Sequence, residues 1–439
     1  RAYSLAGDRI SSLHSRPAYH GLYMAIWAVV PGALLVFLWS AAAPKVEDNI
    51  VAGRFAEHVA EMSLPQRQAF IRDARALARN VTYGTPTPET EAAAEMFRSL
   101  GQTSNSLLAA LLALVVGAGI AWAYRRIAPA ARTRHVVERF IRVLLIICSA
   151  VAIFTTIGIV LSLIFESLRF FQKVPIWDFL FGLHWSPQSA FEGAGGGGPT
   201  NPDVFGAVPL FAGTLLITAI AIFVAAPIGL MAAIYLSDYA SHTFRGIAKP
   251  LLEILAGVPT VVYGFFAALT VAPTIRGFGE SFGLSVASES ALAAGLVMGI
   301  MIIPFVSSLS DDVINSVPQS LRDGSAGLGA TKSETIRRVV LPAALPGIVS
   351  ALLLAISRAI GETMIVVMAA GLAANLTANP LEAVTTVTVQ IVTLLVGDQE
   401  FDSAKTLAAF ALGLVLFCIT LCLNVIALRV VQKYREQYD

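Results

Sequence analysis

Eight long apolar runs follow one another along the chain, and charged residues are nearly absent from each of them. A helix rises about 1.5 Å per residue, so roughly 20 such residues cross the hydrocarbon core of a bilayer. The pattern therefore predicts an all-α fold, a polytopic bundle with eight spans. The runs are Gly21–Ala43, Leu107–Tyr124, Val143–Ile164, Ala207–Leu236, Pro250–Pro273, Ser290–Leu309, Ala343–Leu372 and Leu407–Leu428. The first begins too late and lacks a small-residue cleavage pattern, so we interpret it as a retained span and not as a signal peptide.

Composition agrees with a membrane protein, because 56% of the residues are hydrophobic and only 13% are charged. Soluble domains carry roughly 25% charged residues. The net charge of +1 lacks the basic excess of a nucleic-acid binder. Cys148, Cys418 and Cys422 lie in apolar runs, where we expect buried, reduced thiols. The six histidines show no metal-ligand spacing, and we predict neither a metal site nor a catalytic constellation on this chain.

The connection between the second and third spans carries six arginines against one glutamate. Basic loops stay in the cytoplasm, so alternation places both termini there and the segment 44–106 in the periplasm. In that segment we predict two short helices, with Ser63 and Pro88 at helix starts and Gly101 at a stop. We divide the chain into a cytoplasmic N-terminus with the first span (1–43), the periplasmic segment (44–106), the second span with the basic loop (107–142) and a core (143–439).

The longest predicted cytoplasmic connection is Asp311–Leu341, which has mixed charge and is too long for a tight turn. It reads as a short helix, a turn permitted by glycine, and a second helix over Lys332–Val340 that Leu341-Pro342 stops. Such a helix–turn–helix suits a groove on a partner protein. We expect Asp311 and Asp312 at the start of the next helix, without a transport role, and Lys249 in a charge belt at the headgroup level.

Within this connection, Asp323-Gly324-Ser325 is followed by Gly329, then by nine residues and Val339-Val-Leu341-Pro342. This spacing resembles the EAA loop of ABC-importer permeases, with Asp in place of Glu and Gly-Ser in place of Ala-Ala. In that family the loop docks on a separate ATPase subunit. The resemblance implies a coupling loop at 311–342 and a non-catalytic subunit that holds no cofactor, with ATP and Mg²⁺ on the partner. No stretch of the chain matches a phosphate-cradling P-loop, which agrees with that division.

Two further stretches, Ile254–Phe266 and Ser357–Met364, resemble the paired permeases of phosphate importers, and Met364 favours the PstC type over the PstA type. The likeness covers roughly 177–429. It implies a six-span permease core with two extra N-terminal spans, in a bacterial inner membrane. The implied partners are a PstA-like permease, PstB-like ATPase subunits, a PstS-like periplasmic phosphate-binding protein and membrane lipid, with phosphate as the substrate and no nucleic acid.

Arg358 is the most informative single residue, because it lies inside the apolar run Ala343–Leu372. An isolated charge there costs about 2.5–3.5 kcal/mol on insertion scales. Glu362 follows four residues later, so the two can pair on one helix face. This is either a structural ion pair or part of a substrate pathway. We favour the pathway, with Thr363 beside the pair, because a guanidinium matches tetrahedral oxyanions.

Gly257 and Pro259 lie in the inner part of the fifth run and predict a hinge or gate, while Thr260 and Tyr263 offer neutral donors to the pathway. Close helix packing explains the same residues at least as well. Two alternatives to the phosphate importer also stay open. One is a secondary transporter driven by an ion gradient, which the absence of a clear inverted repeat disfavours. The other is an ABC permease for sulfate, molybdate or phosphonate.

Overall fold

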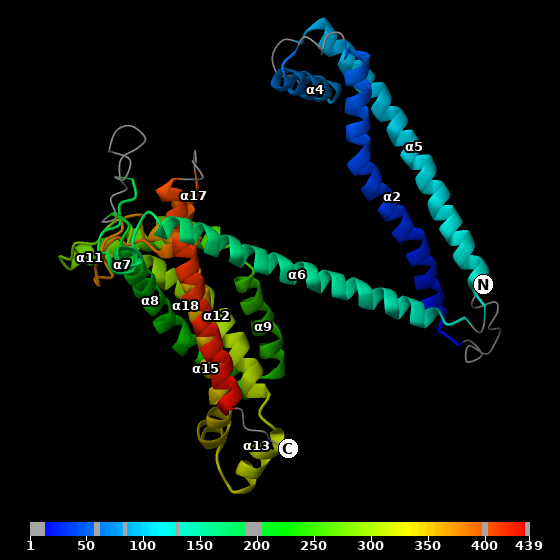
Figure 1. The fold of residues 1–439 in the computed structure, drawn as a ribbon. Coiled ribbons are helices and arrows are strands. Elements are labelled where there is room, and N and C mark those ends of the chain that lie inside the picture. Colours follow the sequence, from blue (N-terminus) through cyan, green and yellow to red (C-terminus); the bar gives the residue numbers. More distant parts are fainter. Residues whose placement is uncertain are drawn as a thin grey trace. The chain divides into compact units, whose positions relative to one another are not determined.

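The computed structural model describes residues 14–56, 62–81, 86–128, 131–188, 204–396 and 403–434. Eight of the described helices are long and apolar enough to cross a membrane, which confirms the predicted all-α class and number of spans. They are Pro17–Arg54, Pro88–Arg126, Thr133–Phe171, Val208–Tyr239, Thr260–Ser281, Ala291–Asn315, Lys332–Ile360 and Ala404–Val430. The chain forms two compact units, Arg1–Phe154 and Thr155–Asp439 (Figure 1).

The first unit is a pair of long helices, α2 (Pro17–Arg54) and α5 (Pro88–Arg126), with the shorter α4 (Leu64–Ala78) packed at one end (Figure 1). As predicted, α4 begins after Ser63, whose backbone N–H donates to the Gln66 side chain at 2.9 Å, and α5 begins at Pro88. The predicted stop at Gly101 is wrong, because α5 continues through it. A glycine costs a helix only about 1 kcal/mol, which packing against α2 offsets.

The second unit contains the remaining helices, and α6 (Thr133–Phe171) carries the boundary between the units. In chain order it then has α7 (Ile176–Phe181), α8 (Val208–Ile234), the short π-helix η4 (Tyr235–Tyr239), α9 (His242–Ala256), α10 (Thr260–Phe266), the short π-helix η5 (Ala267–Val271), α11 (Ala272–Ser281), α12 (Ala291–Asn315), α13 (Gln319–Gly327), α14 (Lys332–Thr335), the short π-helix η6 (Ile336–Val340), α15 (Leu341–Ile360), α16 (Met364–Ala369), α17 (Val387–Leu395) and α18 (Ala404–Tyr434). The predicted linker Gly195–Gly198 lies outside the described residues.

The core of the second unit is built on α8 and α12, which pack closely along their length (Figure 1). Glycines on both helices permit this approach, since a Cβ at Gly295 would lie 2.7 Å from the Ile220 side chain and one at Gly229 would lie 2.8 Å from Val306. The helices α9 and α15 also pack against α12, so α12 lies at the centre of the second unit.

Two of the predicted spans are interrupted. The fifth run breaks at Gly257–Pro259, so that α9 is a separate amphipathic helix and the span begins at Thr260. Proline has no N–H and disfavours helical backbone in the preceding residue, which explains the break. The seventh run also breaks, because α15 ends at Ile360 and α16 restarts at Met364.

Apolar side chains cover much of the isolated chain's surface, as on Phe154 and Phe223, which are 73% and 83% exposed. The three cysteines are free and exposed on these helix surfaces, so the predicted burial is wrong. An apolar run reveals that a helix enters the bilayer, but its lipid-facing residues are as apolar as those inside the bundle.

The close contact of Gly213 on α8 gives a testable consequence for stability. A Cβ there would lie 2.2 Å from the Thr385 carbonyl oxygen, a backbone atom that cannot move aside alone. We expect Gly213→Ala to destabilise the fold by about 1–3 kcal/mol, measured as a lower melting temperature in detergent. Gly246→Ala is the control, because a Cβ at Gly246 meets nothing within 4 Å. Equal melting temperatures for the two variants would contradict the packing.

Candidate translocation pathway and coupling segment

A cavity of about 280 Å³ lies among α9, α12 and α15 in the second unit. It combines two cations, Lys249 and Arg358, with the hydroxyls of Ser307 and Ser308 on α12. The Arg358 guanidinium carbon lies 5.8 Å from the centroid of the Phe305 ring, within range of a cation–π contact. Cations and hydroxyls are the donors that a tetrahedral oxyanion requires, so the cavity offers donors to an anion beside its own two carboxylates, Glu253 and Asp311. Its other lining residues are Leu236, Leu252, Glu253, Ala256, Met301, Pro304, Phe305 and Asp311.

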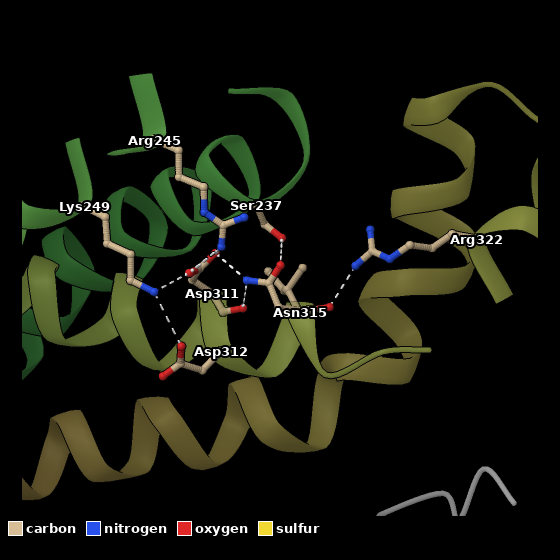
Figure 2. Close-up of polar contacts among 8 residues, drawn as sticks. Ser237, Arg245, Lys249, Asp311, Asp312, Asn315 and Arg322 are labelled. Carbon is tan, nitrogen blue, oxygen red and sulfur yellow. Dashed lines mark hydrogen bonds and ion pairs between the residues drawn. The ribbon is translucent and has the colours of Figure 1, made fainter. Parts of the chain in front are cut away.

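Asp311 forms a buried ionic cluster at one edge of this cavity (Figure 2). Its side chain is 4% exposed. Arg245 donates from Nη2 to both carboxylate oxygens at 3.1 Å, Lys249 donates from Nζ at 3.0 Å, and Asn315 donates from Nδ2 at 2.8 Å. Burial of a carboxylate is costly unless it is paired and hydrogen-bonded, and here it is both. The hydrogen bond from Lys249 to Asp311 raises the pKa of Lys249, which therefore stays protonated at physiological pH.

This cluster corrects one expectation, because Asp311 and Asp312 lie in the last turns of α12 and not at the start of the next helix. Lys249 pairs with Asp311, a contact that the sequence did not indicate, and its place in a headgroup belt stays a prediction. The sequence contained one usable signal, since Arg245 and Lys249 are four residues apart and therefore share a helix face.

The predicted pairing of Arg358 with Glu362 is wrong, because the helix ends between them at Ile360. Glu362 instead accepts from the backbone N–H groups of Met364 and Ile365 at 3.1 and 3.4 Å, at the start of α16. The adjacent Thr363 donates to the Gly361 carbonyl at 3.5 Å. Arg358 alone of this group lines the cavity.

The predicted hinge residues lie at the break before α10. Gly257 ends α9, Pro259 precedes α10, and Thr260 is the first residue of α10. The Tyr263 hydroxyl donates to the Leu255 carbonyl at 2.7 Å, so it bridges the two sides of the break. None of these four residues lines the cavity around Arg358. The helix is broken at Gly257 and Pro259, while the hinge or gate predicted there stays a prediction, and the hydroxyl of Tyr263 serves local packing.

The predicted helix–turn–helix is confirmed, as α13, a turn and α14. Gly329 makes the turn with φ of +84°, a backbone region that other residues rarely adopt. Ser325 and Thr335 join the two helices through a hydroxyl hydrogen bond of 2.9 Å, and Asp323 accepts from Gln319 at 2.9 Å on the exposed side. Sequence reasoning did not single out Leu328, which is 90% exposed at the turn.

The predicted stop at Leu341-Pro342 is wrong, because the chain stays helical from Lys332 to Ile360. The π-helix η6, which includes Val339, leads directly into α15, where Pro342 is the second residue. Proline lacks the N–H of a regular helix, and the wider π-helical turn before it, in which the Leu341 N–H donates to the Ile336 carbonyl, lets the helix continue. Gly324 lies within α13, and a Cβ there would meet nothing within 4 Å. Because the helix is continuous from Lys332 to Ile360, the second helix of the helix–turn–helix leads without a break into α15, the span that carries Arg358.

Polar contacts also fix α13 to the ends of α8 and α12. Arg322 pairs with Asp238 of η4 and donates to the Ile314 carbonyl at 2.8 Å. Beside it, the Ser237 hydroxyl donates to Asn315 at 3.1 Å, and Asn315 in turn donates to Asp311 (Figure 2). Polar contacts thus extend from η4 and the end of α12, where α13 is anchored, to the edge of the cavity.

A multi-span helical bundle with an anion-suited cavity and a helix–turn–helix at one end defines the chain as a membrane permease. Residues 225–436 match the family described as "Binding-protein-dependent transport system inner membrane component", and residues 1–155 match "Phosphate ATP-binding cassette transporter". The chain belongs to the PstC group of ABC transporter permeases. This membership decides against the alternative of a secondary transporter driven by an ion gradient.

Two relatives in sequence support that assignment. The chain is 31% identical over 281 residues to "Probable ABC transporter permease protein YqgH" of Bacillus subtilis, covering 64% of this chain and 86% of the relative. It is 31% identical over 282 residues to "Phosphate transport system permease protein PstC 1" of Mycobacterium tuberculosis, covering 58% and 83%. A crystal structure of a bacterial alginate ABC transporter aligns with a TM-score of 0.46 at 14% identity, over 67% of this chain and 96% of that chain.

Proposed function

We propose that this permease carries phosphate through the membrane as one subunit of an ATP-driven importer. The observation that carries the proposal is the cavity in which Arg358 and Lys249 approach the same space as Ser307 and Ser308. A phosphate ion that leaves water needs cationic and neutral donors to replace its hydration. The names of the PstC relatives support phosphate as the anion.

The proposed assembly has this chain beside a PstA-like permease, two PstB-like ATPase subunits and a PstS-like binding protein. Both termini and α13 lie in the cytoplasm, as the basic connection between the second and third spans favours. ATP and Mg²⁺ bind to the ATPase subunits, and this chain holds no cofactor and catalyses no reaction. The turn with Leu328 supplies an exposed apolar side chain for a groove on the ATPase.

Uptake of labelled phosphate tests the proposal. In a strain that lacks this chain, we expect the chain to restore ATP-dependent uptake, with little competition from a tenfold excess of sulfate, molybdate or phosphonate. The control is the strain with the empty vector. Uptake of sulfate would assign the permease to another oxyanion. So would phosphate uptake that a competing oxyanion suppresses as strongly as unlabelled phosphate does. Uptake that survives loss of the ATPase subunits would contradict the importer itself.

A further inference from the structure

The Asp311 carboxylate accepts hydrogen bonds from a set of donors that could also bind a diffusible anion. Donors from three side chains, Arg245, Lys249 and Asn315, converge on this one carboxylate. The carboxylate is almost fully buried, whereas the side chains of Arg245 and Lys249 are 32% and 35% exposed. Each oxygen of a tetrahedral oxyanion accepts hydrogen bonds as a carboxylate oxygen does, so the same donors suit phosphate.

The position of the cluster connects it to the proposed pathway. Asp311 and Lys249 line the cavity that Arg358 also lines. Within this cavity the two cations are balanced by two carboxylates, Asp311 and Glu253. An anion held by Arg358 therefore lies in the same cavity as a second cation, Lys249. The Asp311 carboxylate of the chain itself is already paired with Lys249.

We propose that Asp311 is a tethered counter-anion, and that phosphate in transit exchanges with its carboxylate at Lys249 and Arg245. This inference rests on the proposed function and adds a second anion site to it. Exchange of one anion for another keeps the half-buried cations Arg245 and Lys249 paired throughout, whereas a cation left unpaired at this depth would be costly. Because the tethered carboxylate always competes, phosphate does not stay bound, and a permease requires such a weak site.

The test is the melting temperature of the purified transporter complex in inorganic phosphate and in sodium chloride of equal ionic strength. In chloride, Asp311→Asn should melt at a lower temperature than the wild type, because Lys249 and Arg245 have lost their counter-anion. In phosphate, the melting temperature of this variant should be at least about 3 °C higher than in chloride, because phosphate binds to the two unpaired cations of the folded state. The wild type and Asp311→Glu should melt alike in the two salts. Asp312→Asn is the matched control, because Asp312 is the adjacent carboxylate, exposed and 3.7 Å from Lys249.

The double variant Asp311→Asn with Lys249→Met should lose the gain in phosphate. Equal melting of Asp311→Asn in the two salts would overturn the proposal and leave Asp311 as a structural ion pair only. If Asp311→Asn does not accumulate, Lys249→Met decides, because it leaves Asp311 paired with Arg245. Uptake by Lys249→Met should fall at least tenfold, and normal uptake would overturn the exchange. Failure of the proposed function is a separate result, visible in the wild type as an absence of phosphate uptake.

Discussion

Replacement of Arg358 by alanine is expected to lower phosphate uptake about a hundredfold while the chain still folds and assembles. Arg358 contributes a guanidinium to the cavity, and the guanidinium carbon lies 5.8 Å from the centroid of the Phe305 ring. Loss of charge-assisted hydrogen bonds to phosphate removes about 3 kcal/mol, which corresponds to roughly a hundredfold. The measurement is the initial rate of labelled phosphate uptake, with co-purification of the partner subunits as the test of assembly.

Two further variants distinguish a substrate contact from an ion pair. Arg358→Lys keeps the charge but loses the planar fork, so uptake should be intermediate. Glu362→Gln should act independently of Arg358, because Glu362 contacts the backbone at the start of α16. The double variant Arg358→Ala with Glu362→Gln should therefore reduce uptake by the product of the two single reductions. Recovery of uptake in the double variant would contradict the separation of the two side chains, and normal uptake by Arg358→Ala would contradict the pathway.

The sequence predicts the fold well where the signal is local. Apolar runs predict eight spans because bilayer thickness sets their length, and the pattern Ser63-Leu-Pro-Gln66 predicts a helix start because its own hydrogen bonds form the cap. The turn at Gly329 is predicted for the same reason, since few residues other than glycine adopt its backbone conformation. These features depend on neighbours within a few positions.

Prediction of the site fails for two different reasons, one local and one at long range. The helix break between Arg358 and Glu362 is hidden from the hydrophobic pattern because the flanking residues, Ala359-Ile360 and Met364-Ile365, are apolar and fit a single long run. Asp311 pairs with residues 62 and 66 positions away, and no local pattern in one sequence indicates which helices meet. Arg358, which lines the cavity, can be singled out without those contacts, because a charge inside an apolar run is costly wherever its partners lie.

Substitution of Leu328 by aspartate is expected to abolish uptake by a different route, through loss of the proposed ATPase contact. Leu328 is 90% exposed at the Gly329 turn, and it makes little contribution to the fold of the isolated chain. An aspartate there places a charge in the partner's apolar groove, so the ATPase should no longer co-purify, whereas Leu328→Met should behave as the wild type. Co-purification of the ATPase with Leu328→Asp would contradict this docking surface.

Arg322→Ala provides the complementary result, because Arg322 anchors α13 to Asp238 and to the Ile314 carbonyl. We expect this variant to retain the ATPase but to lose most of the stimulation of ATP hydrolysis by the binding protein, since α13 is then released from the ends of α8 and α12. Under this proposal, docking depends on the exposed side chain of Leu328 at the turn, and transmission depends on the contacts that Arg322 makes behind it. If Leu328→Asp and Arg322→Ala both lose co-purification of the ATPase, the helix–turn–helix acts as a single docking surface. In that case the polar contacts from Arg322 to Asp311 have no separate role in coupling ATP hydrolysis to transport.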